Sequence, residues 1–230
     1  QNIILAIIEP SLKRYNLGIL AEESDPDQSR LEKHAFWTID PLDGTQYFIE
    51  GKSGYAVSIA LVLNDGKSLL GVVYDPVEQK MYKAVRGRGL TINDKAFQSP
   101  PMNPLSSTET WTWFADRSLK KHRHYERYRT NFSIRFVGGA VMNSLQLLST
   151  PKSIYLKAPK SSLGGCAIWD LAAVSLILEE CQAQAHFYDG RALHLNRSSI
   201  FFNDVGLAFC SADLDYQYVR QRLEQIENGL

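Results

Sequence analysis

Cysteine is scarce in this sequence, and its few cysteines are not arranged as a disulfide framework or a zinc site. Three occur among 230 residues, Cys166, Cys181 and Cys210. They form an odd, scattered set with no C-x-x-C spacing, which argues against both kinds of stabilisation. Free thiols are typical of a reducing compartment, so we predict a cytoplasmic protein.

Long apolar runs and an excess of charge of one sign are also lacking. No apolar run reaches the roughly 20 residues that a membrane-spanning helix needs. The start, Gln1-Asn2-Ile3, has no basic region followed by an apolar stretch and a cleavage site. The chain has 25 acidic and 25 basic side chains and no net charge, so no overall field attracts nucleic acid or an anionic membrane. We therefore expect neither as a partner.

What is present describes a globular chain in two halves. Apolar residues make up 44% and charged residues 22% of the sequence, enough for one sizeable core or two sub-domains. The most linker-like stretch is Ser-Pro-Pro-Met-Asn-Pro at 99–104. We place the boundary there, with an N-terminal α+β half at 1–105 and a C-terminal α/β half at 106–230.

The apolar periodicity differs between the halves. In the first, a helix at 3–15 is expected to pack on a sheet, and strands at 55–63, 69–75 and 79–85 form an antiparallel meander with an Asp-Gly hairpin turn at 65–66. In the second, strands alternate with helices expected at 117–129, 140–148 and 171–178, a pattern typical of α/β structure.

The stretch Trp-Thr-Ile-Asp-Pro-Leu-Asp-Gly-Thr at 37–45 is the best candidate for chemistry. An apolar strand-like run ends on Asp40, and Asp43 follows after a proline and a leucine. Pro41 fixes its own φ and favours an extended Asp40, so the two carboxylates are held close together. Like charges at that separation raise each other's pKa or bind a cation, and an oxygen-only site suits Mg²⁺, Mn²⁺ or Ca²⁺.

Taken alone, this stretch is equally compatible with an ordinary turn. Asp-Pro and Asp-Gly pairs are common turn formers. A calcium-binding loop fits poorly, because the third spaced oxygen ligand and the closing Glu of such a loop are missing. The rest of the chain has to decide between the turn and the metal site.

Four segments in order carry a resemblance to a known family. WTIDPLDGT closely resembles the W-x-[IV]-D-P-[IL]-D-G-T signature of the inositol monophosphatase superfamily of magnesium-dependent, lithium-sensitive phosphatases. Ala-Glu-Glu-Ser at 21–24 is similar to its G-E-E-S element, with Ala21 in place of Gly. Gly-Val-Val-Tyr-Asp-Pro-Val at 71–77 resembles its G-V-V-Y strand, and Trp-Asp-Leu-Ala-Ala at 169–173 resembles its W-D-x-A-A element.

The resemblance implies a fold and a site. The fold would be a layered αβαβα sandwich, with an antiparallel sheet in the first half and a mixed α/β second half. Two or three Mg²⁺ ions, which Mn²⁺ could replace, would activate a water for in-line attack on a phosphomonoester. Li⁺ would inhibit this phosphatase activity. The implied catalytic residues are Glu23, Asp40, Asp43 and Thr45. The implied metal ligands are Glu23, Asp40, the Leu42 carbonyl, Asp43 and Asp170, and the implied substrate contacts are Gly44, Thr45 and Asp170. Gly139, at the start of the helix expected at 140–148, is a further expected substrate contact.

Two of these assignments have open alternatives. Glu22 and Glu23 follow a short strand and point to opposite faces, so only one faces the metals, and the resemblance selects Glu23. Asp170 precedes the apolar helix expected at 171–178 and would serve equally as its N-cap without any metal.

Substrate is inferred from the residues before Asp170. Lys157 and Lys160 make this neighbourhood basic, which suits a substrate with a second phosphate. The chain thereby looks most like the 3'(2'),5'-bisphosphate nucleotidases, which remove the 3' phosphate from adenosine 3',5'-bisphosphate in sulfate assimilation. An inositol or sugar phosphatase is the alternative, since loop lysines are often merely solvated.

A third possibility is a non-catalytic binding or regulatory homologue. The family carries a T-x-A-D-like segment upstream of the first matched helix, and this sequence starts after that point with a residue other than Met. We expect that the protein has this segment and that it lies upstream of the residue numbered 1 here. We also expect a monomer or homodimer acting on a small phosphorylated substrate.

Overall fold

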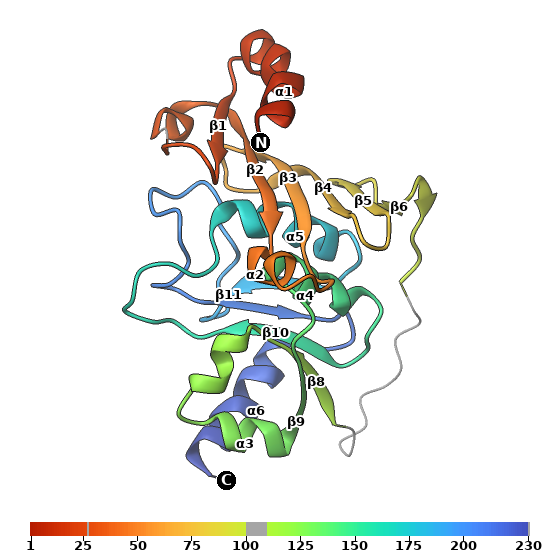
Figure 1. Ribbon diagram of the computed structural model, residues 1–230. Coiled ribbons are helices and arrows are strands. Elements are labelled where there is room, and N and C mark those ends of the chain that lie inside the picture. The colour runs from red at the N-terminus through yellow and green to blue at the C-terminus, as the bar shows by residue number, and fades with distance from the viewer. Residues whose placement is uncertain (27, 100–109, 230) are drawn as a thin grey trace.

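The computed structural model describes residues 1–26, 28–99 and 110–229, and it shows alternating layers of helix and sheet. From the top of Figure 1 downwards they are α1, a first sheet, a helical layer with α4 and α5, a second sheet, and an outer layer of α3 and α6. This confirms the expected αβαβα architecture. The predicted linker, apart from Ser99, and the boundary at 105/106 lie outside the described residues.

The first sheet has seven strands in sequence order: β1 (Gly18–Ala21), β2 (Ala35–Asp43), β3 (Ala56–Leu63), β4 (Ser68–Asp75), β5 (Lys80–Val85), β6 (Leu90–Ile92) and β7 (Lys95–Ala96). Only β1 and β2 pair in parallel; the other neighbours are antiparallel, so the expected meander is confirmed. β3 alternates buried and half-buried residues along its length, as a strand with one face on the core should.

The second sheet has the strand order β11-β12-β10-β8-β9. Its members are β8 (Trp111–Phe114), β9 (Phe132–Arg135), β10 (Ser153–Lys157), β11 (Gln184–Phe187) and β12 (Leu207–Cys210). The three strands β10, β8 and β9 run parallel. Their carboxyl ends therefore meet at one edge, where ligands of open α/β sheets commonly bind.

The helix α5 (Ile168–Glu179) joins the two sheets. It packs against β2, β3, β4 and β5 of the first sheet and β11 of the second. Ten of its twelve residues are buried, as expected for a helix that is apolar on every side. The remaining helices are α1 (Asn2–Tyr15), α2 (Thr45–Ile49), α3 (Tyr125–Asn131), α4 (Ala140–Leu145) and α6 (Tyr216–Asn228), with short 3₁₀ turns η1 (Gln28–Glu32), η2 (Arg117–Lys121) and η3 (Gln146–Leu148). None of the helices in the described part of the chain is long and apolar enough to cross a membrane.

Three predicted helices differ from the structure in division, length or packing, and the fourth, α5, begins earlier than predicted. Instead of one helix at 117–129 there are η2 and α3, because His122 is extended and turns the chain so that its ring stacks on the buried Tyr128. The helix at 140–148 ends as α4 at Leu145 and tightens into η3. The helix α1 forms, but no residue of it is buried. A hydrogen bond from Trp37 Nε1 of β2 to Ser11 Oγ, at 2.9 Å, joins it to the first sheet.

Candidate metal and phosphate site

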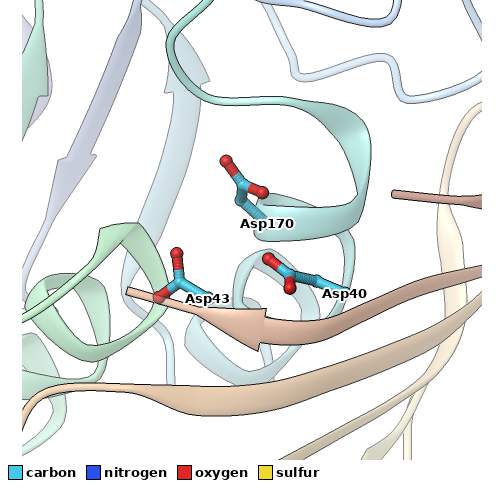
Figure 2. A group of neighbouring side chains, drawn as sticks. All are labelled: Asp40, Asp43 and Asp170. Atoms are coloured by element: carbon cyan, nitrogen blue, oxygen red, sulfur yellow. The ribbon is translucent and has the colours of Figure 1, made fainter. Parts of the chain in front are cut away.

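Three aspartates from two distant segments form the candidate site. Asp40 and Asp43 lie at the end of β2, and Asp170 lies in the first turn of α5. One carboxylate oxygen from each lies within 4.8 Å of the other two, and Figure 2 shows the three side chains pointing toward one another. The structure thus joins the two motifs that are about half the chain apart in sequence.

A β-bulge places Asp40 and Asp43 on the same side of the sheet. In a regular strand, residues three apart point to opposite faces. Here Asp40 pairs with Ser58 and Asp43 with Ala56, so β2 advances three residues while β3 advances two. The extra residue of the bulge turns the strand, and Pro41, which has no N–H, is tolerated at such an interruption.

Asp43 is held rigidly by the start of α4. Its two carboxylate oxygens accept hydrogen bonds from the backbone N–H groups of Ala140 and Val141, at 3.1 and 3.0 Å. Gly139 caps this helix, and a Cβ on it would lie 2.3 Å from Asp43 Oδ2. Gly139 therefore permits the contact between Asp43 and α4, while its own N–H donates to Gly54 O at 2.9 Å.

Asp170 lies inside its helix and not at the N-cap position. α5 begins at Ile168 with Ala167 as N-cap, three residues earlier than predicted. One Asp170 oxygen accepts from the Ala167 N–H at 2.9 Å, which satisfies one donor that the helix start leaves free. Asp170 therefore combines a local capping bond with a place in the acidic cluster.

The electrostatics of the cluster call for a cation. Burial, then repulsion from Asp170 and Asp43, raises the pKa of Asp40, and burial likewise raises the pKa of Asp43. Burial raises the pKa of Asp170 from 3.8 to about 6, although its bond from Ala167 works in the opposite sense. Three buried carboxylates with raised pKa values are costly to ionise unless a positive charge compensates them. An all-oxygen donor set at this spacing fits a hard divalent cation.

The structure brings Glu22, and not the predicted Glu23, to the acidic cluster. Glu22 extends the line of β1 beside β2, its N–H donating to Ile39 O at 3.1 Å, and its carboxyl group hydrogen bonds to Asp40. The Glu23 N–H instead donates to Gln1 Oε1 at 3.0 Å. Among the described residues no bond joins Glu23 to the three aspartates. Glu22 is thus the acid of this pair that contacts Asp40, and which of the two binds a metal stays a prediction.

Two other predicted phosphate contacts, Gly44 and Thr45, directly follow Asp43 in the chain. Thr45 is exposed at the start of α2, and its hydroxyl donates to the Leu42 carbonyl at 3.0 Å. Gly44 has φ +82°, a left-handed conformation that glycine adopts without strain. A Cβ there would also lie 2.6 Å from Gly54 O. This turn is thus shaped by the close approach of three chain segments.

A cavity of about 500 Å³ lies beside the cluster, at the carboxyl ends of β8 and β10. Lys157 lines it and forms an ion pair of 2.5 Å with Asp116. Both residues line the cavity and also influence the pKa of Asp43, so the ion pair lies near the acidic cluster. Burial opposes the charge of Lys157, yet its neighbours Cys166 and Asp116 raise its pKa. Lys160 also lines the cavity and is exposed.

Sequence reasoning missed Glu22 and Asp116. Asp116 accepts hydrogen bonds from Tyr155 and Asn143 as well as its ion pair with Lys157. It follows the apolar strand Trp-Thr-Trp-Phe-Ala, as Asp40 follows a similar run. A carboxylate directly after a buried strand could therefore have identified Asp116 in the same way as Asp40. For Glu22, strand alternation alone could not decide the direction.

Comparisons with known proteins agree with the resemblance carried by the sequence motifs. A model described as the inositol monophosphatase family matches residues 3–223. The Nus factor SuhB of Pasteurella multocida is 31% identical over 181 residues, covering 76% of this chain and 65% of that protein. The 3'(2'),5'-bisphosphate nucleotidase CysQ of Shigella flexneri is 28% identical over 199 residues, covering 82% and 74%.

Solved structures agree in fold. The inositol monophosphatase of Thermotoga maritima has a TM-score of 0.73 at 22% identity, covering 97% of this chain and 80% of that one. The chain spans about two thirds of the length of the SuhB relative. Similarity at this level identifies an architecture and leaves the reaction to be argued from the site.

Proposed function

Because this chain belongs to the inositol monophosphatase family, we propose that it is a Mg²⁺-dependent phosphomonoesterase that removes the 3' phosphate from adenosine 3',5'-bisphosphate. The observation that carries the proposal is the convergence of Asp40, Asp43 and Asp170 within 4.8 Å, next to a cavity lined by lysines. An acidic cluster holds cations, and the adjoining cavity gives room for the group to which the phosphate is attached.

Asp40, Asp43 and Asp170 would hold Mg²⁺, with Mn²⁺ as a substitute and Li⁺ as an inhibitor. Glu22 takes the place given to Glu23 in the sequence prediction, because its carboxyl group already contacts Asp40. The Leu42 carbonyl, directly before Asp43 in the chain, would be a further oxygen ligand. When bound, such cations neutralise phosphate charge and lower the pKa of a coordinated water.

The chain's own groups would position the reactants. Thr45 donates a hydrogen bond from its hydroxyl to the Leu42 carbonyl, so its oxygen can still accept a hydrogen bond from the attacking water and orient it. The Gly44 and Thr45 amides lie at the following turn and would donate to phosphate oxygens as the negative charge develops. Asp43, fixed by two backbone bonds, keeps its position while the substrate exchanges, since it need not reorganise.

The second phosphate of the substrate would bind at the rim of the cavity. Lys157 is already paired with Asp116, so its charge is largely compensated. Lys121 and Lys160 also line the cavity and are exposed. With the 3' phosphate at the aspartates, these two lysines are the natural partners of a 5' phosphate.

Phosphate release from adenosine 3',5'-bisphosphate and from inositol 1-phosphate tests the proposal. We expect Mg²⁺-dependent, Li⁺-inhibited release that is faster from the nucleotide. Asp170→Asn should abolish it, and the matched surface control Asp65→Asn, in a hairpin turn, should leave it unchanged. Faster release from the inositol ester would refute the substrate. No release by the intact protein would favour a non-catalytic binding role.

An inositol or sugar phosphate is the second candidate. Asp116 lines the cavity, and a carboxylate there can accept hydrogen bonds from sugar hydroxyls. Asp116→Asn should lower kcat/KM for inositol 1-phosphate specifically if this candidate is correct.

A further inference from the structure

Aromatic rings form part of the cavity lining, and three of them pack together as one wall. Trp113, His122, Tyr128, Tyr188 and Phe202 all line it. The rings of Trp113 and Tyr128 are 4.9 Å apart, and Tyr128 in turn stacks on His122 at 5.3 Å with the ring planes 29° apart. Trp113 and Tyr128 are buried, whereas His122 is half-buried. We call Trp113, Tyr128 and His122 the aromatic stack; His122 is its outermost ring.

The His122 ring is locally fixed. Its Nδ1 accepts a hydrogen bond from the His124 N–H at 3.3 Å, so Nε2 carries the proton of the neutral ring. Burial lowers the pKa of His122, so the ring is neutral at physiological pH. A flat neutral ring is thus part of the cavity lining, packed on Tyr128 and next to the ring of His124, whose centroid is 5.7 Å away.

This wall distinguishes between two kinds of leaving group. A cyclitol carries hydroxyls around its whole ring, and those that lie against the aromatic wall would lose water there without gaining a partner. A purine offers two flat faces that stack on aromatic side chains and edge nitrogens that accept hydrogen bonds. The wall therefore suits the purine.

We propose that His122, backed by Tyr128 and Trp113, is the base-recognition surface of this protein, and that it stacks against the purine of the nucleotide whose phosphate binds at the aspartates. This inference rests on the proposed function for the identity of the nucleotide. It assigns the aromatic residues of the cavity to the base, the exposed lysines Lys121 and Lys160 to one phosphate, and the acidic cluster to the other.

Binding of adenosine 5'-monophosphate, the expected product, tests the assignment without any turnover. Isothermal titration of the full chain in Mg²⁺ should show tighter binding of adenosine 5'-monophosphate than of ribose 5-phosphate, which lacks the base. His122→Ala should weaken the nucleotide about tenfold, as loss of a stacked ring does, and leave ribose 5-phosphate unchanged. His122→Phe keeps a ring and should recover most of the affinity.

His34→Ala is the matched control, because His34 is exposed and lies just before β2; it should bind like the wild type. Equal binding of the two ligands by the wild type would overturn the proposal, and so would an unchanged nucleotide affinity in a folded His122→Ala variant. Base-dependent binding without phosphate release would instead sink the proposed hydrolysis while supporting the base surface.

Discussion

At the scale of the residue, the acidic cluster lowers the stability of the metal-free fold and at the same time forms the candidate cation site. Asp40 and Asp43 are 1% and 7% exposed, and each is surrounded by other carboxyl groups. Without a cation, ionising them costs free energy, because burial and mutual repulsion both disfavour the charge. Residues selected for packing alone would not be placed this way.

Replacing Asp40 with Asn should separate the two effects. In metal-free protein, Asp40→Asn removes the cost of either burying the Asp40 charge or protonating this carboxyl group at neutral pH, and we expect the free energy of unfolding to rise by about 0.5–2 kcal/mol. The same variant should lose the increase in thermal stability that Mg²⁺ gives the wild type. Thermal melts with EDTA and with Mg²⁺ measure both. Asp65→Asn should change neither, and an unaltered Mg²⁺ response in Asp40→Asn would exclude Asp40 as a ligand.

A second residue-scale prediction concerns Gly139. The Cβ of Gly139→Ala would lie 2.3 Å from Asp43 Oδ2, so Asp43 or α4 must move. Because Asp43 is proposed as a ligand, we expect Mg²⁺ affinity to fall by about 10–100-fold, the usual cost of disturbing a ligand's support. Calorimetric titration with Mg²⁺ checks this. Gly51→Asn is the control, since Gly51 has open space around it and φ +64°, which Asn tolerates.

At the scale of the element, α5 both builds the core and carries Asp170. Its buried side chains contact both sheets, so the position of Asp170 depends on the packing of the whole helix. A shift of α5 would carry Asp170 away from the aspartates of β2. The core and the candidate site are for this reason mechanically linked.

Truncation within α5 should be costly. Leu176 is fully buried, and Leu176→Ala should lower the free energy of unfolding by about 2–5 kcal/mol through lost contacts and the cavity left behind. The same truncation at Leu163, which is 82% exposed, should cost less than about 0.5 kcal/mol. Urea unfolding monitored by circular dichroism compares the two. Equal losses would contradict the position of α5 at the centre of the core.

At the scale of the whole molecule, the cluster couples folding to pH and to metal. The pKa of Asp170 is raised from 3.8 to about 6 on folding, so the folded protein binds this proton more tightly than the unfolded chain. The associated stability is complete below pH about 4 and is lost as pH rises to about 6. A bound cation stabilises the ionised carboxylates and so opposes this loss.

Metal-free protein should therefore be less stable at about pH 7.5 than at about pH 5, by about 1–3 kcal/mol. With saturating Mg²⁺ the difference should shrink, because the cation binds the ionised form. Urea unfolding at both pH values with EDTA or Mg²⁺ measures it. Asp170→Asn should reduce the metal-free pH dependence and leave the part that comes from the raised pKa values of Asp40 and Asp43; a slope unchanged in that variant would show that Asp170 does not contribute.

The sequence by itself determined the fold class, the family resemblance and the two motifs around Asp40–Asp43 and Asp170. These are local signals: apolar periodicity marks strands and helices, and a carboxylate after a buried strand marks a strand end. The order of the motifs along the chain was enough to identify the architecture, although it could not measure any separation between them.

Only the tertiary structure decided which side chains meet. The closeness of Asp40 and Asp43 was predicted from Pro41, but the bulge that puts both on one face of β2 was not, and a regular strand would place residues three apart on opposite faces. The path of β1 beside β2 selects Glu22 over Glu23, and the break at His122 replaces a predicted helix with a wall of the cavity. Each outcome depends on contacts between segments far apart in the chain, and the energies of those contacts exceed the local preferences that a sequence reveals.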